Sequence, residues 1–207
     1  MADGGGDPAS RTVRYGDPAD MRAVSRMLAR AFEDDPQARW MHPRPESRSK
    51  QLRISFERSF RESCGTSDGV DLAVDDAGEI VGSALWIASP RMRVKATLGD
   101  RIGMWRAYGS RTRQAVDAAH LVWSSHVPEP HWHLLAIATA GEVRGRGYGE
   151  ALMNSGLSRC RADGLPAHLE TGKPENIPYY QRFGFEVIAT IDLPHGGPRN
   201  WLMRYGP

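Results

Sequence analysis

The sequence predicts an α/β domain of the α+β type, in which helices flank a mixed and mostly antiparallel sheet. Three observations support this fold class. Residues 132–171 read as strand, helix and strand, so their two strands should be parallel with a right-handed crossover. Residues 70–87 read as an antiparallel hairpin. The length of 207 residues suits one domain and would make two domains cramped.

Composition narrows the class of protein. Apolar residues make up 40% and charged residues 25% of the chain, and the net charge of +2 gives no electrostatic reason to expect nucleic acid or an anionic membrane as partner. Residues 1–10 are rich in Gly, Ala and Asp. We therefore expect a disordered tail, no signal peptide and a cytoplasmic location, with a single domain over residues 11–207. No apolar run has the length of a membrane span.

The N-terminal half predicts a strand, two helices and the hairpin. Residues 12–15 form the strand, and Asp17 caps the helix that follows, with Pro18 at its first position. A second helical region covers residues 45–64. The first helix should bury an apolar stripe at helical spacing, made of Met21, Val24, Leu28 and Ala31 or Phe32.

The segment of residues 91–127 is rich in Arg, Ala, Met and Trp at roughly helical spacing, so we expect one or two helices there. Its arginines are more typical of a solvated face than of a basic patch. After the strand–helix–strand series, a short helix and two strands complete the domain, over residues 176–183, 185–193 and 200–204.

A glycine-rich turn connects the strand over residues 132–139 to the next helix. Glycines let a backbone approach a ligand closely, and the first turn of a helix offers unpaired N–H groups with a favourable dipole. Three glycines that alternate with larger residues suit a pyrophosphate. The turn therefore predicts an anion cradle, composed of Arg144, Gly145, Arg146, Gly147, Tyr148 and Gly149.

Two motifs in this half resemble those of the GNAT superfamily of N-acetyltransferases. Arg144, Gly147 and Gly149 match its Arg/Gln-x-x-Gly-x-Gly/Ala motif, and residues 176–185 match its Asn…Tyr-x-x-x-Gly-Phe segment. Within the family, residues 129–204 are most similar to puromycin N-acetyltransferase-like enzymes. Gly141 is a departure, since these enzymes usually have Pro there.

The resemblance implies a sheet that splays apart at its central parallel strands, with acetyl-CoA as co-substrate in the gap. Acetyl would pass to a primary amine by direct attack within a ternary complex. The predicted cofactor-binding residues are Ile137, Ala138, Thr139, Arg144, Gly145, Arg146, Gly147, Tyr148, Gly149, Glu150 and Asn176.

The resemblance also implies catalytic and acceptor-binding residues. Tyr180 holds the position of the family's tyrosine and would protonate the leaving thiolate. Glu142 and Glu170 are candidate bases, as are His133 and Asp35, although ordered water can replace a strong base. The acceptor side would be lined by Asp35, Trp40, Trp86 and His133, which suits a cationic, partly aromatic, antibiotic-like amine.

Structural roles compete with these assignments. Tyr180 could be a core residue, Asp35 a helix cap and Glu170 a structural hydrogen-bonding group. His131 and His133 lie two apart on a strand, but no further ligands join them in the sequence, so we expect no metal.

Other functions also stay open. A dinucleotide-binding enzyme would need a different glycine spacing and more strands. A catalytically silent acyl-CoA-binding module, or an acetyltransferase acting on protein or peptide amines, fits the same motifs. The sequence does not decide between a monomer and a homodimer.

Overall fold

The computed structural model describes residues 11–64, 69–88, 98–126 and 128–206. The predicted tail over residues 1–10 and the beginning of the arginine-rich segment, residues 91–97, lie outside this range. Within it, no helix is both long and apolar enough to cross a membrane.

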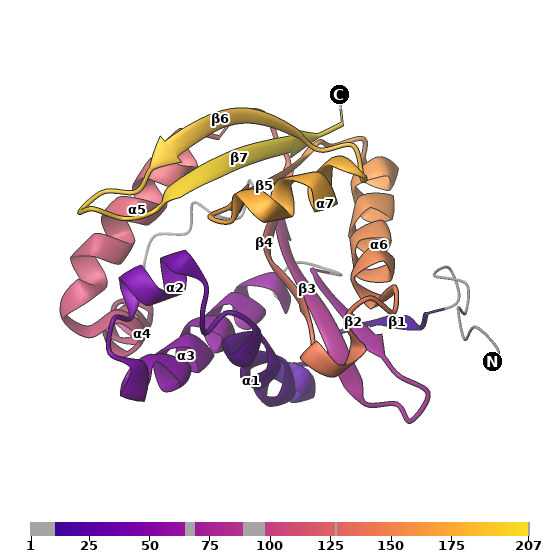
Figure 1. The fold of residues 1–207 in the computed structure, drawn as a ribbon, viewed down its shortest axis with the longest axis horizontal. Helices are drawn as coiled ribbons and strands as arrows, with labels where there is room; N and C mark the ends of the chain where they lie inside the picture. Colours follow the sequence, from indigo (N-terminus) through magenta and orange to yellow (C-terminus); the bar gives the residue numbers. More distant parts are fainter. Residues whose placement is uncertain (1–10, 65–68, 89–97, 127, 207) are drawn as a thin grey trace.

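A seven-stranded sheet with the order β1-β2-β3-β4-β5-β7-β6 forms the centre of the molecule (Figure 1). Only β4 and β5 are parallel, and every other neighbouring pair is antiparallel. The mixed sheet expected from the sequence is therefore confirmed. The strands are β1 (Val13–Tyr15), β2 (Val70–Val74), β3 (Ile80–Ala88), β4 (Trp132–Thr139), β5 (Ala167–Thr171), β6 (Glu186–Asp192) and β7 (Arg199–Tyr205).

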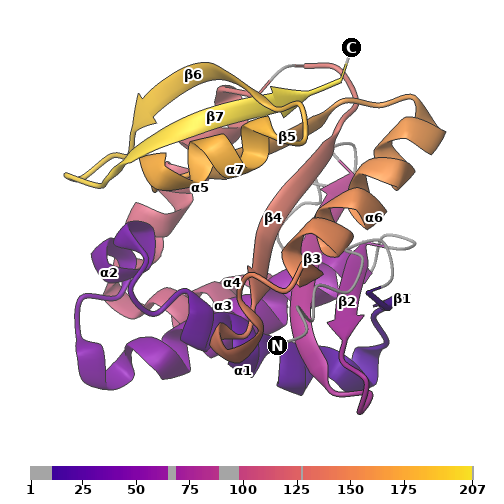
Figure 2. The same cartoon turned by 45° about the vertical axis from the view of Figure 1, so that its right-hand side comes forward.

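Helices cover both faces of the sheet. In both views α6 (Tyr148–Asp163) lies on one side of β3, and α1 (Met21–Ala31) and α3 (Pro45–Cys64) lie on the other (Figures 1 and 2). The other helical elements are η2 (Pro18–Asp20), α2 (Pro36–Met41), α4 (Leu98–Tyr108), η4 (Gly109–Arg111), α5 (Thr112–Ser124), η5 (Gly141–Val143), η6 (Pro174–Asn176) and α7 (Ile177–Gln181).

Two apolar clusters fix these layers. Under α6, Leu152, Met153 and Leu157 pack against the sheet with exposed fractions of 2% or less. On the opposite face Val24 and Leu28 of α1 pack with Leu72 and Leu85, as the predicted stripe required. Burial of side chains of this size stabilises the fold by about 1.5–3 kcal/mol each.

The first helix begins where its sequence predicts, and one further helix was not predicted. Asp17 and Asp20 form a reciprocal capping box around η2, which leads directly into α1. Asp35 caps α2, its side chain accepting from the N–H of Gln37 at 2.9 Å. Six residues are too few to show an apolar period, so α2 gave no signal beyond its cap and Pro36.

The central strands separate soon after they meet. Both strands are fully described, and β4 pairs with β5 only through its residues Trp132 to Leu134. At the next residue β4 contains a bulge, because Leu85 faces Ala136 whereas Trp86 faces Leu134. Bulges bend a strand and increase its twist. Leu135 is therefore the point at which β4 turns away from β5.

Candidate active site

The glycine turn forms an open cradle at the beginning of α6. Gly145 and Gly147 adopt φ angles of +79° and +84°, which favour glycine. The N–H groups of Gly145, Gly147, Tyr148, Gly149 and Glu150 donate no backbone hydrogen bond within the described chain. Residues 144–146 are exposed. The cradle therefore offers a row of free donors at a helix N-terminus, as an anion requires.

Arg11, which no sequence motif marks, adds a cation to this cradle. Its Nε donates to the carbonyl of Arg146 at 3.0 Å, and its guanidinium lies 5.1 Å from the centre of the Tyr148 ring. The two residues are 135 positions apart in the chain. Only the folded sheet, which brings β1 toward α6, places them together.

The gap between β4 and β5 continues from the cradle. Ile137, Ala138 and Thr139 lie beyond the last pair with β5, so the β5-facing backbone groups of this stretch have no strand partner there. Asn176 is half-buried at the end of η6, and its side chain has no hydrogen-bond partner within the described chain. The predicted cofactor residues therefore lie in three places: at the N-terminus of α6, on β4 beyond its last pair with β5, and at the end of η6.

The two tyrosines of α7 point to different places. A Cβ atom at Gly149 would lie 3.1 Å from the hydroxyl of Tyr179, so Tyr179 reaches the first turn of α6. Tyr180 is buried with Phe185 in the cluster under α6, and burial raises its pKa above the usual value near 10. The Tyr180 phenol therefore keeps its proton at neutral pH.

The other face of β4 and β5 holds a buried group that we call the histidine cluster: His126, His131, His133 and His168 with Glu170. His126 Nε2 lies 2.5 Å from Glu170 Oε1, and His133 Nε2 lies 2.9 Å from Glu170 Oε2. Trp123 covers His126 and His133 edge-on. Four of the seven histidines of the chain thus gather around one carboxylate.

Hydrogen bonds fix where the protons of this cluster lie. His131 Nδ1 must donate to the carbonyl of Glu129 at 2.8 Å, because that oxygen only accepts. Burial lowers the pKa of His131, so its Nε2 is an acceptor for His126 Nδ1 at 3.1 Å. The two ring nitrogens of His126 therefore bridge His131 and Glu170.

His133 completes this arrangement on the other oxygen of Glu170. Its Nε2 donates to the carboxylate, and its Nδ1 is buried without a partner. The pKa of Glu170 is lowered by the adjacent His133 and His126, whose attraction outweighs the opposing effect of burial. A carboxylate that orients an imidazole in this way strengthens the imidazole as a base.

The cluster also bears on the expectation that no metal is bound. The ligand atoms of His126, His133 and Glu170 lie within 4.8 Å of one another, close enough to surround an ion. However, two ligands of a tetrahedral zinc ion stand roughly 3.3 Å apart. The 2.5 Å separation of His126 and Glu170 fits a shared proton better. The absence of a metal stays a prediction.

The predicted acceptor residues are not all in one place. Asp35 lies 3.6 Å from Lys173, which follows β5. The negative charge of Asp35 adds to the rise in the pKa of Tyr180. Trp40 of α2 packs against Gly197 of the β6–β7 turn and donates to the carbonyl of His195 at 3.4 Å. Asp35 and Trp40 therefore connect the N-terminal half to the segment after β5 and to the β6–β7 turn.

Two predicted residues lie elsewhere. Trp86 is fully buried beneath α6, where a Cβ at Gly156 would come within 2.3 Å of its ring. An acceptor could not reach it there, so we assign Trp86 to the core. Glu142 is exposed on η5 and contacts neither Tyr180 nor the histidine cluster. It lies beside the cradle, where a negative charge would oppose an anionic ligand.

Sequence reasoning missed His126 and His168 as members of the site. His126 follows α5, and His168 alternates with Leu169 on β5, so neither belongs to a motif. The one available signal was the strand period, which places His133, His168 and Glu170 on a common face once the strands are parallel.

The match to a family model agrees with this geometry. Residues 26–185 match the acetyltransferase (GNAT) family model, which is more than half of the chain. The protein is therefore an acetyltransferase of the GNAT family, as its splayed sheet and glycine cradle indicate.

Individual relatives are distant. An uncharacterised N-acetyltransferase of Schizosaccharomyces pombe is 27% identical over 190 residues, which are 84% of this chain and 74% of that protein. A Corynebacterium glutamicum structure described as histone acetyltransferase HPA2 and related acetyltransferase is 28% identical, with a TM-score of 0.70 over 96% of this chain and 97% of that one. A Sinorhizobium meliloti phosphinothricin acetyltransferase in complex with acetyl-CoA shares the fold, with 22% identity, a TM-score of 0.57 and coverage of 95% and 89%.

Proposed function

We propose that this protein transfers acetyl from acetyl-CoA to the primary amine of a small molecule by direct attack in a ternary complex. One observation carries the proposal: the gap between β4 and β5 has a buried phenol on one side and a carboxylate held by imidazoles on the other. Leu169 packs in the same cluster as Tyr180, and Glu170, the next residue of β5, points to the opposite face. An acid and a base therefore flank the position of the thioester.

The cradle would hold the pyrophosphate of acetyl-CoA. The free N–H groups from Gly145 to Glu150 supply donors, and Arg11 and Arg144 supply positive charge. The pantetheine arm would then occupy the gap, where it can hydrogen-bond to Ile137–Thr139 as a missing strand would. An N–H there that faces the thioester oxygen would stabilise the oxyanion by about 2.7–4 kcal/mol.

Each proton of the reaction has a place in this site. The amine nitrogen attacks the thioester carbon, the carbon–nitrogen bond forms, and the carbon–sulfur bond breaks. The ammonium gives its first proton to the Glu170–His133 pair before the attack, directly or through water, and the nitrogen loses its second proton as the tetrahedral intermediate collapses. Tyr180 gives its proton to the departing thiolate and regains a proton when the nitrogen releases this second one, so that the phenol is restored. Glu142 has no part in this scheme because it lies outside the gap.

A cationic acceptor suits the acceptor side. Asp35, which lies 3.6 Å from Lys173, and Glu170 of β5 supply carboxylates, and Trp40 and Trp123 supply aromatic surface. This combination supports a small, partly aromatic amine such as an antibiotic. The likeness to puromycin N-acetyltransferase-like enzymes, the cytoplasmic location and the choice between monomer and homodimer stay predictions from the sequence.

The test is thiol release from acetyl-CoA with a panel of amines. Puromycin, aminoglycosides, polyamines and arylalkylamines represent small acceptors, and a lysine-containing histone peptide represents proteins, since one relative is described as a histone acetyltransferase. We expect release with a small amine. Release with the peptide alone would replace the small-molecule acceptor with a protein one. Tight acetyl-CoA binding with no release from any amine would favour a silent binding module.

A further inference from the structure

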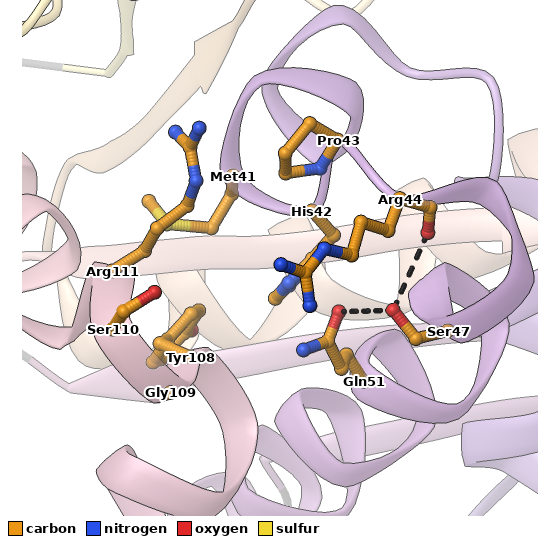
Figure 3. A pocket seen from close by; sticks show the side chains of 10 residues that line it. All are labelled: Met41, His42, Pro43, Arg44, Ser47, Gln51, Tyr108, Gly109, Ser110 and Arg111. Carbon is orange, nitrogen blue, oxygen red and sulfur yellow. Dashed lines mark hydrogen bonds between the residues drawn. The ribbon is translucent and has the colours of Figure 1, made fainter.

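A second cavity lies outside the proposed catalytic site, between the end of α2 and the junction of α4 with η4 (Figure 3). It has a volume of about 410 Å³, which is in the range of small-molecule sites. None of its lining residues belongs to the cradle, to the gap or to the histidine cluster. The proposed acetyl transfer leaves it without a role.

The walls of this cavity are positively charged. Arg44 and Arg111 face it from two different elements, and none of its lining residues is acidic. Behind the wall, the buried Arg48 donates to the carbonyls of His42, Glu33 and Pro43. Within the described chain neither Arg44 nor Arg111 forms an ion pair with a carboxylate. A partly enclosed site with two such cations attracts anions.

His42 supplies a second and independent sign of a ligand. It is 3% exposed, it lines the cavity, and its Nδ1 has no hydrogen-bond partner. Burial and the nearby Arg48 lower its pKa to about 4, so the ring is neutral at physiological pH. A buried polar atom without a partner costs free energy. His42 also stacks on Tyr108, at 5.5 Å between ring centres and 6° between planes, which gives the cavity a flat aromatic wall.

We propose that this cavity binds a small organic oxyanion, a carboxylate or a phosphate ester that carries a flat apolar group. The guanidinium groups of Arg44 and Arg111, which come from two different elements, would hold the anionic group (Figure 3). The imidazole of His42 and the hydroxyl of Ser110 would add hydrogen bonds. The flat part of the ligand would lie against Tyr108.

Such a ligand would also strengthen the contact between α2 and the β6–β7 turn. Arg111 donates to the carbonyl of Trp40 at 3.0 Å and to Gln114 at 2.9 Å, and Trp40 in turn contacts His195 and Gly197. An oxyanion on the free side of the Arg111 guanidinium would hold that side chain in place. The ligand should therefore raise the melting temperature of the cofactor-free protein.

The experiment measures binding by calorimetry and thermal shift, without acetyl-CoA, using benzoate and phenyl phosphate as probes and inorganic phosphate as the comparison. We expect saturable binding of at least one aromatic probe, tighter than that of inorganic phosphate. Arg44→Gln should weaken it about tenfold, as expected for the loss of one charged hydrogen bond. Arg44 is exposed and makes no side-chain hydrogen bond within the described chain, so this variant should fold normally.

Arg106→Gln is the matched control, because Arg106 is exposed on α4, does not line the cavity and changes the net charge equally. It should bind the probes like the wild type, and both variants should bind CoA unchanged. No saturable binding of either aromatic probe, or an equal loss in the two variants, would overturn the proposal. Neither result depends on acetyl transfer, so the proposed function is tested separately.

Discussion

The glycine cradle and the histidine cluster lie toward opposite ends of the same strand, β4, and they are built in different ways. The cradle is made of consecutive residues, and its donors are backbone N–H groups at the beginning of α6. The cluster is made of side chains from the segment after α5, from β4 and from β5, and it forms only when these meet. A local site can therefore be read from one stretch of sequence, whereas a site assembled from distant segments requires the fold.

The largest expected effect is on the cradle side. Gly147→Val should weaken acetyl-CoA binding at least about 100-fold, because φ is +84° there and a branched side chain would enter the approach to the donors. Calorimetry with acetyl-CoA measures this. Gly78→Val is the control, since Gly78 has a φ of +81° in the β2–β3 turn, away from the cradle. Equal losses of affinity in both would mean that strain alone, and not the cradle, is responsible.

The next effect separates the two tyrosines of α7. Tyr180→Phe should lower kcat about 100-fold with little change in the dissociation constant of acetyl-CoA, because it removes a general acid. Tyr179→Phe should instead act on cofactor binding, since its hydroxyl adjoins Gly149. If the Tyr180 variant lost affinity and kept its turnover, the phenol would be a binding group and not an acid.

On the cluster side, Glu170→Gln should lower kcat about tenfold or more and leave acetyl-CoA affinity unchanged. An amide cannot accept a hydrogen bond on both of its atoms, so His126 and His133 would lose their common partner. His126→Gln should give a smaller decrease, because His133 keeps its contact with the carboxylate. Steady-state rates over a range of pH would show this order, and full activity of the Glu170 variant would remove the pair from the mechanism.

A smaller effect concerns stability. Burial and the neighbouring histidines lower the pKa of His168 to about 3 from 6.5, so between these pH values the folded state binds fewer protons than the unfolded chain. Stability should therefore fall as the pH drops below 6.5. Melting curves of His168→Asn should show a shallower acid dependence than the wild type. A steeper one would mean that His168 is charged in the folded protein.

Removal of metal ions should have no effect on turnover. Treatment with EDTA should leave turnover unchanged, because His126 and Glu170 are spaced for a proton and not for a metal ion. Loss of activity that zinc restores would show that the histidine cluster is a metal centre.

Features made of contiguous residues could be predicted from the sequence, whereas those assembled from distant segments could not. The bounds of α3, β2, β4, β5 and α6 follow from apolar period, caps and glycine stops, and they agree with the sequence to within a residue. The cradle could be predicted because its residues are contiguous. The roles of three other residues could not be predicted, because their partners are distant in the chain. Arg11 lies 135 residues from Arg146, and His126 lies 44 residues from Glu170. His168 of β5 stacks on His126, which follows α5. Trp86 was misplaced because strand alternation alone does not say which face of β3 meets α6.

The short pairing of β4 with β5 has a consequence for the chain without its cofactor. A sheet of seven strands ordinarily has two borders, but here the separation after Leu134 creates two more in the interior. Unpaired borders invite other extended chains. Residues 135–139 should therefore exchange their amide hydrogens quickly in the free protein, and the cofactor would act as a temporary eighth strand that closes the seam.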